Sequence, residues 1–309
     1  MLDALLDDGA ARRLPLAEAA AAHRALLAGD LRDLVAALVV PADRAGELPD
    51  VLTAGDLGTR VLLAADPADS ADPGVDDDPR TVGGPVAALR SLEAARSALW
   101  DEDRIELVGR RLPFPAGAPD PATLAAGLLP LLASTVPTWL TLPPDAASTA
   151  GTESGEGDAG AVLDVLAADG AEYVTLDVSG DPATVARLLR ALVDRDLTFR
   201  TTGVPTGPKP GSPGSPGSPG SPGEHGDGVV PGVLNVLCAV RAALNGAEAP
   251  ELAQVLAADR PELLVSAVRR MSAADGAVVR AFLVAVEVPD ATAAAARLQE
   301  LGLVDDTFS

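Results

Sequence analysis

Residues 171–203 limit the fold more strongly than any other part of the chain. Residues 172–178 are short, apolar and rich in β-branched side chains, which is typical of a buried strand. Asp181 and Pro182 then supply an N-cap and a first-turn proline, and apolar residues follow at helical spacing. Residues 197–202 again have strand character. A strand, a crossover helix and a second strand predict a right-handed βαβ unit with parallel strands.

The same alternation of strands and helices extends to both sides of this unit. Seven strands are predicted, at residues 36–40, 59–65, 104–108, 136–142, 172–178, 197–202 and 278–288. Helices are expected between them and over residues 1–35. This order predicts a parallel sheet with helices outside it. With 309 residues, the chain is expected to form a single α/β domain, a TIM-like parallel β/α barrel whose ring is either complete or irregular or incomplete; an open doubly wound sheet is the alternative.

Three stretches are expected to be flexible insertions in this domain, at about residues 66–84, 145–160 and 205–228. They are rich in Gly, Pro, Ser and acidic residues, and the third repeats Gly-Ser-Pro four times from Gly211. Four triplets in one chain are too few for a collagen helix, so a flexible linker is predicted. The insertions follow the second, fourth and sixth predicted strands. All three are therefore expected on one face, where the binding sites of such folds form.

Composition excludes several classes of function. The net charge of -22 argues against binding nucleic acid or an anionic membrane through a basic surface. A single cysteine, Cys238, excludes an internal disulfide and a multi-cysteine metal site. The two histidines, His23 and His225, do not form a transition-metal cluster, so no metal site and no cofactor are predicted. No strand is followed by a P-loop or by a Gly-x-Gly-x-x-Gly motif.

Localisation follows from the same kind of argument. Residues 1–8 lack the basic region of a signal peptide, and no apolar stretch is long enough to span a membrane. We therefore expect a cytoplasmic protein. Abundant Ala, Gly and Pro, with arginine far in excess of lysine, indicate a GC-rich bacterial genome. The sequence does not specify an oligomeric state.

Arg200 is the most informative candidate for a functional site. Phe199 is expected to pack beneath the outer helices, so Arg200 and Thr202 would face the interior of the barrel. A buried charge requires a partner. The partner is either an internal acid, Glu106 or Asp177, or the carboxylate or phosphate of a ligand. Asn235, one turn into a helix near the same face, either caps that helix or directs its amide into a pocket. The candidate ligand-binding residues are Arg200, Thr202, Asn235, Asp177 and Glu106.

Two short motifs in the last third of the chain resemble a family of uncharacterised bacterial proteins. Residues 199–203 read Phe-Arg-Thr-Thr-Gly, where that family has Phe-Lys-x-Thr followed by Gly and two His. Residues 231–235 read Pro-Gly-Val-Leu-Asn, where the family has His-Gly-Phe-Leu-Asn. Arg200 replaces the Lys, Pro231 replaces the His, and the paired His are absent. The resemblance implies no particular reaction, and the departures imply that chemistry carried by those groups would be lost here.

Two functions follow as hypotheses. The first is a barrel that binds a small anionic molecule, a carboxylate or a phosphate, with or without catalysis. The second is a non-catalytic scaffold or interaction protein that has lost an ancestral site. A polar pocket around Arg200 supports the first hypothesis, whereas an interior filled by Leu and Val supports the second.

Replacing residues 205–228 with a short Gly-Ser loop is expected to leave the free energy of unfolding nearly unchanged, because a linker of Gly-Ser-Pro repeats is expected to bury no apolar surface. Loop length itself changes the closure entropy by only about 0.6 kcal/mol per doubling. Urea unfolding of the two proteins measures the difference. A loss of several kcal/mol would show that the segment packs against the domain.

Overall fold

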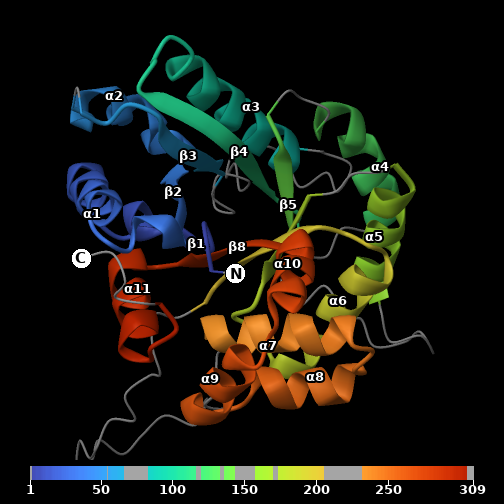
Figure 1. The fold of residues 1–309 in the computed structure, drawn as a ribbon. Helices are drawn as coiled ribbons and strands as arrows, with labels where there is room; N and C mark the ends of the chain where they lie inside the picture. The colour runs from blue at the N-terminus through green and yellow to red at the C-terminus, as the bar shows by residue number, and fades with distance from the viewer. Residues whose placement is uncertain are drawn as a thin grey trace, which may run out of the picture.

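Eight parallel strands form a closed barrel in which each strand pairs with the next along the chain (Figure 1). β1 pairs with both β2 and β8, which closes the ring. The computed structural model describes residues 2–53, 55–65, 83–115, 120–132, 136–142, 157–169, 173–204 and 232–304. The strands are β1 (Leu6–Asp8), β2 (Val35–Pro41), β3 (Thr59–Ala64), β4 (Ile105–Pro113), β5 (Thr138–Leu142), β6 (Val174–Asp177), β7 (Phe199–Thr202) and β8 (Leu283–Val288).

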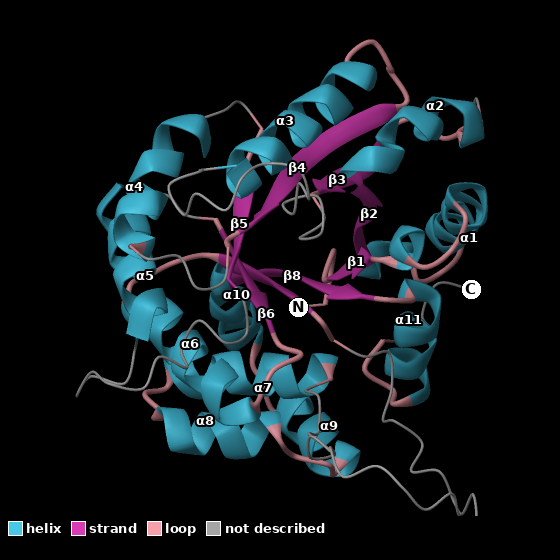
Figure 2. Ribbon diagram, turned by 180° about the vertical axis from the view of Figure 1, so that it is seen from behind, coloured by secondary structure: helices cyan, strands magenta, loops and turns pink. Residues whose placement is uncertain are grey.

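Helices surround the barrel and follow one another around it (Figures 1 and 2). In Figure 1 α10 lies in front of the strands and in Figure 2 behind them, and it packs against α7 and β8. The α-helices are α1 (Leu16–Ala28), α2 (Leu48–Val51), α3 (Gly83–Ala98), α4 (Pro121–Leu132), α5 (Gly157–Asp169), α6 (Pro182–Asp194), α7 (Val233–Leu244), α8 (Ala249–Leu256), α9 (Pro261–Arg269), α10 (Ala273–Phe282) and α11 (Ala291–Glu300). Short 3₁₀ helices are η1 (Ala10–Arg12), η2 (Arg32–Leu34) and η3 (Ala42–Glu47).

The predicted βαβ unit is confirmed as β6, α6 and β7. The two strands are parallel and adjacent, with Leu176 opposite Thr201. Asp181 caps α6, since its carboxylate accepts a hydrogen bond of 3.1 Å from the backbone N–H of Thr184. Pro182 is the first residue of the helix, where its missing N–H costs nothing. The local signals in this stretch were therefore sufficient to define its structure.

The TIM-like barrel is also confirmed, and the open doubly wound sheet is wrong, because the pairing of β1 with β8 leaves no free edge. The predicted helix over residues 1–35 is wrong in one part, since Leu6–Asp8 form β1, the eighth strand. This strand has only three residues and two of them are acidic. Acidic residues are rare in strands, so β propensity gave no indication of it.

Four predicted boundaries also change. The last strand begins at Leu283 rather than at residue 278, because Ser272 caps a helix that continues to Phe282. β4 continues to Pro113, past residue 108, and so includes two adjacent arginines. The expected insertions at 66–84 and 145–160 are shorter at their ends, since Gly83 and Gly157 already belong to α3 and α5.

The expected insertion at residues 205–228 lies outside the described residues, as do residues 66–82 and 143–156. Each of these segments comes after the carboxyl end of a strand: residues 66–82 follow β3, residues 143–156 follow β5 and residues 205–228 follow β7. Within the described ranges, no helix is both long enough and apolar enough to cross a membrane.

Apolar side chains form two layers, one between the strands and the helices and one inside the barrel. The outer layer is the larger and consists mainly of Leu, Val and Ala, with Phe199 fully buried in it. The inner layer is small and lies mainly on the β2 and β3 side of the barrel; its buried members are Ala37, Val39, Leu62, Ala64 and Trp139. Because neighbouring residues of a strand point to opposite faces, the burial of Phe199 in the outer layer directs Arg200 into the barrel.

Leu176→Ala is expected to reduce the free energy of unfolding by roughly 2–5 kcal/mol, because it leaves a cavity in the core. Leu176 is 1% exposed and packs in the outer layer. Urea unfolding measures the loss, and Leu57→Ala is the matched control, since Leu57 is 75% exposed. Equal effects of the two substitutions would contradict the burial of Leu176.

Candidate functional site

Charged side chains occupy the barrel interior near the carboxyl ends of the strands. Asp7 of β1, Arg111 of β4, Arg200 of β7 and Glu287 of β8 are each no more than 6% exposed. Arg12 of η1 joins them from the barrel mouth and is 38% exposed in its side chain. We call these five residues the charged cluster. Buried charges are costly unless they are paired, so their contacts decide what the cluster can do.

The first pair joins Arg200 to Asp7. Nη1 of Arg200 donates a hydrogen bond to Oδ2 of Asp7, across the interior from β7 to β1. The guanidinium carbon of Arg200 also lies 4.6 Å from the ring centre of Trp139, within the range of a cation–π interaction. Trp139 packs in turn against Tyr173, with ring centres 4.9 Å apart. Arg200 is thus held by an acid on one side and by an aromatic ring on another.

The second pair joins Arg111 to Glu287 across the full width of the barrel, since β4 and β8 lie on opposite sides of the ring. Three side chains contact the carboxylate of Glu287. Its Oε2 receives Nη1 of Arg111 and, at 3.0 Å, the hydroxyl of Thr202. Its Oε1 lies 3.1 Å from Nε of Arg12. One carboxylate therefore links the deep Arg111 to the partly exposed Arg12.

The electrostatic balance of the charged cluster is unequal, because three arginines face two carboxylates. Burial raises the pKa of the Asp7 carboxyl above its usual value, and the neighbouring Arg200 opposes this shift. Glu287 is the register neighbour of Asp7 and also raises its pKa by repulsion. Among the described residues, several buried polar atoms near the cluster have no hydrogen-bond partner; they are Asp7 Oδ1, Arg111 Nη2, Arg200 Nε, Trp139 Nε1, Thr141 Oγ1 and Thr175 Oγ1.

The missing side chain of Gly109 makes room for the Trp139 ring. A Cβ atom at Gly109 of β4 would lie 2.8 Å from Leu62 Cδ1 and 2.9 Å from Trp139 Nε1. Any larger residue at this position would displace Trp139, the ring against which Arg200 stacks. Gly109 therefore supports the position of Arg200 indirectly.

The structure brings together only some of the residues proposed from the sequence. Arg200 and Thr202 face the interior as expected, and Thr202 contacts Glu287. Asp177 lies at the end of β6 beside Thr202, where its Oδ1 accepts a hydrogen bond of 2.8 Å from the backbone of Ser179. The expected pairing of Arg200 with Asp177 or Glu106 is wrong, because Asp7 holds that position. Sequence analysis had assigned the segment containing Asp7 to a helix.

Glu106 and Asn235 lie outside the charged cluster. Glu106 is near the start of β4, at the opposite end of the barrel, where it is exposed and 3.8 Å from Arg60. Both ends of the Asn235 side-chain amide form hydrogen bonds to backbone groups. Oδ1 accepts one from Gly232 N, and Nδ2 donates to the carbonyls of Val255 and Ala258. The capping interpretation of Asn235 is therefore the correct one.

Sequence reasoning missed Asp7, Arg12, Arg111 and Glu287. A usable signal existed for Glu287, a lone acid in the apolar run Leu283–Val288. Arg111 gave a weaker signal, since the adjacent Arg110 has the same side chain but faces outward, where it bonds Glu93 and Thr138. Two adjacent arginines cannot be assigned to a face of the strand from their types alone.

Other titratable groups have structural partners. Asp8, next to Asp7, accepts hydrogen bonds from Ala10 N and pairs with the buried His23 of α1 at 3.1 Å, which connects that helix to β1. Burial raises the pKa of the Cys238 thiol to about 11, so this cysteine is a poor nucleophile. Within the described ranges, no group of three or more His, Cys, Asp or Glu is arranged to hold a metal ion.

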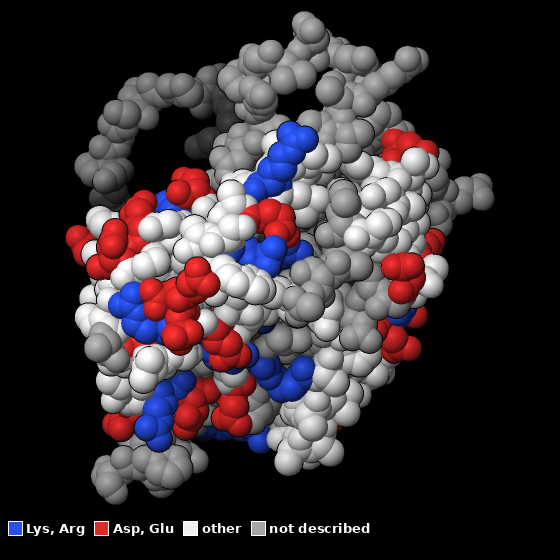
Figure 3. Space-filling model, turned by 90° about the horizontal axis from the view of Figure 1, so that it is seen from above, with Lys and Arg blue, Asp and Glu red and all other residues white. Residues whose placement is uncertain are grey.

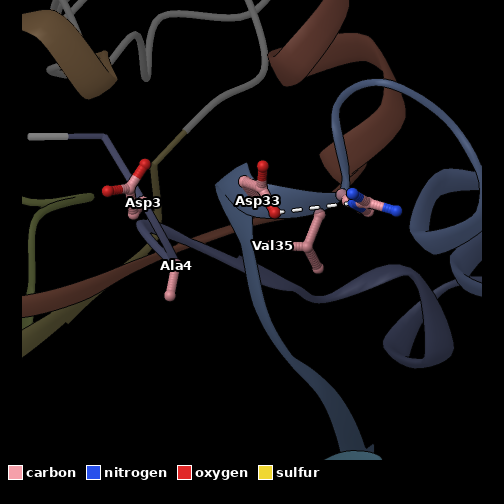
Figure 4. Close-up of a pocket in the computed structure, with 5 residues that line it drawn as sticks. Asp3, Ala4, Asp33 and Val35 are labelled. Atoms are coloured by element: carbon pink, nitrogen blue, oxygen red, sulfur yellow. Dashed lines mark ion pairs between the residues drawn. The ribbon is translucent and has the colours of Figure 1, made fainter. Parts of the chain in front are cut away.

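A shallow pocket lies at the opposite end of the barrel, beside the starts of β1 and β2 (Figure 4). It is lined by Asp3, Ala4, Arg32, Asp33 and Val35. Nε of Arg32 lies 3.7 Å from Oδ1 of Asp33, and both side chains are largely exposed. Their ion pair therefore contributes little to stability. The amino-terminal face of such barrels typically serves stability rather than binding, which favours the charged cluster as the site.

Comparisons of the chain with protein-family models, with curated proteins and with solved structures return no match. The resemblance of residues 199–203 and 231–235 to a bacterial family therefore stays a prediction.

Arg200→Met is expected to reduce the free energy of unfolding by about 3–5 kcal/mol at pH 7, because it leaves the buried Asp7 carboxylate without its partner. The folded-state pKa of Asp7 is already above the unfolded value, so protonation of this carboxyl favours the folded protein. This contribution to stability is lost as the pH rises through the folded-state pKa. Removing Arg200 raises this pKa further. The loss should therefore be smaller at pH 4 than at pH 7 when measured by urea unfolding.

Two further variants test this explanation. Asp7→Asn combined with Arg200→Met should recover much of the lost stability, because no charge is then stranded. Arg187→Met is the control, since Arg187 is exposed on α6. A pH-independent loss in the single Arg200 variant would argue for lost packing on Trp139 instead of a stranded acid.

Proposed function

We propose that this protein binds a small anion, a carboxylate or a phosphate, at the carboxyl end of its barrel. The observation that carries the proposal is the convergence of Arg12, Arg111 and Arg200 on only two carboxylates, Asp7 and Glu287. One bound monoanion would balance these five charges. Guanidinium groups suit this role because their planar N–H donors match the oxygens of carboxylates and phosphates.

The depth and accessibility of the arginines support the same ligand class. Arg12 is partly exposed at the barrel mouth and could make first contact with an anion. Arg111 lies deeper, and its Nη2 is a buried donor with no partner among the described residues. In barrels of this kind, ligands bind at the carboxyl ends of the strands. The proposal concerns binding, and the cluster by itself does not specify a reaction.

The alternative function is a non-catalytic scaffold or interaction protein. Its specific support is that Asp7 and Glu287 already pair with Arg200 and Arg111, so the interior is largely neutralised without a ligand. The loss of the family's Lys and His at Arg200 and Pro231, if the resemblance is correct, agrees with this alternative.

For partners and location, we infer a cytoplasmic bacterial protein that does not bind nucleic acid or membranes. The inference rests on the net charge of -22 and on composition. Figure 3 shows acidic and basic side chains interspersed on the left of the face, and an uncharged surface on the right that is bordered mainly by acidic side chains. Interspersed charges of both signs are a poor surface for a polyanion.

Inorganic phosphate, and small carboxylates in a parallel series, should raise the melting temperature in a concentration-dependent manner, because a ligand that binds only the folded state stabilises it. Arg12→Gln should weaken this effect, since it removes the accessible guanidinium. Arg13→Gln is the matched control, with the same charge loss at the adjacent, exposed position. All titrations are made at constant ionic strength to exclude general screening.

The alternatives give different results in this experiment. A shift of equal size in the Arg12 and Arg13 variants would indicate a general salt effect. If none of the anions stabilises the wild-type protein, the scaffold function is favoured.

A further inference from the structure

Glu287 has the position that a bound anion would take. Its carboxylate contacts Arg12 and Arg111 together and accepts a hydrogen bond of 3.0 Å from the Thr202 hydroxyl. These are the donors expected to surround the carboxylate or phosphate of a ligand. Glu287 therefore resembles an internal ligand, supplied by β8 to a site built from η1, β4 and β7.

We propose that the Glu287 carboxylate acts as an internal competitor that small carboxylates or phosphates must displace from Arg12 and Arg111 in order to bind. This inference rests on the proposed function and adds a regulatory element to the same site. The exchange substitutes one anion for another. The buried Arg111 thus keeps an anionic partner throughout, and the cost that remains is that of moving the Glu287 carboxylate out of its own contacts.

The competition also explains how a cluster with three arginines can be stable without a ligand. If Glu287 were absent, Arg111 would be buried with no carboxylate on its Nη1 and with an unpartnered Nη2. With Glu287 in place, the site is occupied, and its affinity for an external anion is reduced by the free energy of the internal contact. Affinity would then depend on how firmly Glu287 is held.

The turn that carries Arg12 confines Glu287 closely. A Cβ atom at Gly9 would lie 3.1 Å from Glu287 Oε1, 3.3 Å from its Cγ and 2.9 Å from the carbonyl oxygen of Val288. The φ angle of Gly9 is -84°, which other residues adopt easily, so the close approach, and not the backbone conformation, favours glycine here. The segment from Gly9 to Arg12 therefore restricts the space into which the Glu287 side chain can move.

The decisive measurement is phosphate affinity, by isothermal calorimetry at constant ionic strength, for the wild type and Glu287→Gln. The amide keeps the size of the side chain and removes the competing charge. We expect phosphate to bind on the order of tenfold more tightly to Glu287→Gln, because the competing carboxylate is gone. A tenfold change corresponds to about 1.4 kcal/mol of binding free energy. Glu106→Gln is the matched control. It removes the same charge from the opposite end of the barrel and should leave the affinity unchanged.

Unchanged or weaker binding by Glu287→Gln, with clear binding by the wild type, would overturn the competition and leave the proposed function intact. Failure of both proteins to bind phosphate or small carboxylates would reject the proposed function as well.

A second measurement applies if Glu287→Gln does not fold. A crystal structure of the wild type at high phosphate concentration should show phosphate on Arg12 and Arg111, with the Glu287 carboxylate displaced. Phosphate bound to Arg12 while Glu287 keeps its contacts with both arginines would contradict the inference, and so would the absence of phosphate from the cluster.

Discussion

The ion pair between Asp7 and Arg200 is the contact on which the inside of this barrel depends. It joins the first strand to the seventh across β8, and it is buried within an otherwise tightly packed ring. β1 has three residues only, so few backbone hydrogen bonds can hold it. An electrostatic contact between its central residue and a distant strand therefore contributes to the closure of the ring. Because both partners are buried, loss of one costs far more than the pair itself contributes.

The two layers of the barrel use different interactions. Between strands and helices, Leu, Val and Ala provide nearly all the buried surface, in agreement with an aromatic content of 2%. Inside the barrel, small apolar residues fill the β2 and β3 side, while charged and hydroxyl side chains occupy the remainder. Stability thus rests mainly on the outer layer. The interior can therefore carry polar groups, provided that each charge has a partner.

Pairing within the interior also limits what the site can bind. Glu287 connects Arg111, Thr202 and Arg12, and Asp7 is bound to Arg200, so an external ligand meets donors that are already occupied. A neutral ligand would have to break these contacts without replacing a charge, which is costly in a buried site. An anion replaces like with like. This is the physical reason for the proposed ligand class, small oxyanions, over neutral or cationic molecules.

The sequence by itself determined the fold class and the local elements other than β1. Residues 172–202 carry their own caps, turns and periodicity, so the βαβ unit and the inward direction of Arg200 could be predicted from neighbouring residues alone. Only the tertiary structure decided the partners. Asp7 lies 193 positions from Arg200, and Arg111 lies 176 positions from Glu287. No local pattern records such distances, because ring closure, and not strand propensity, brings these charges together.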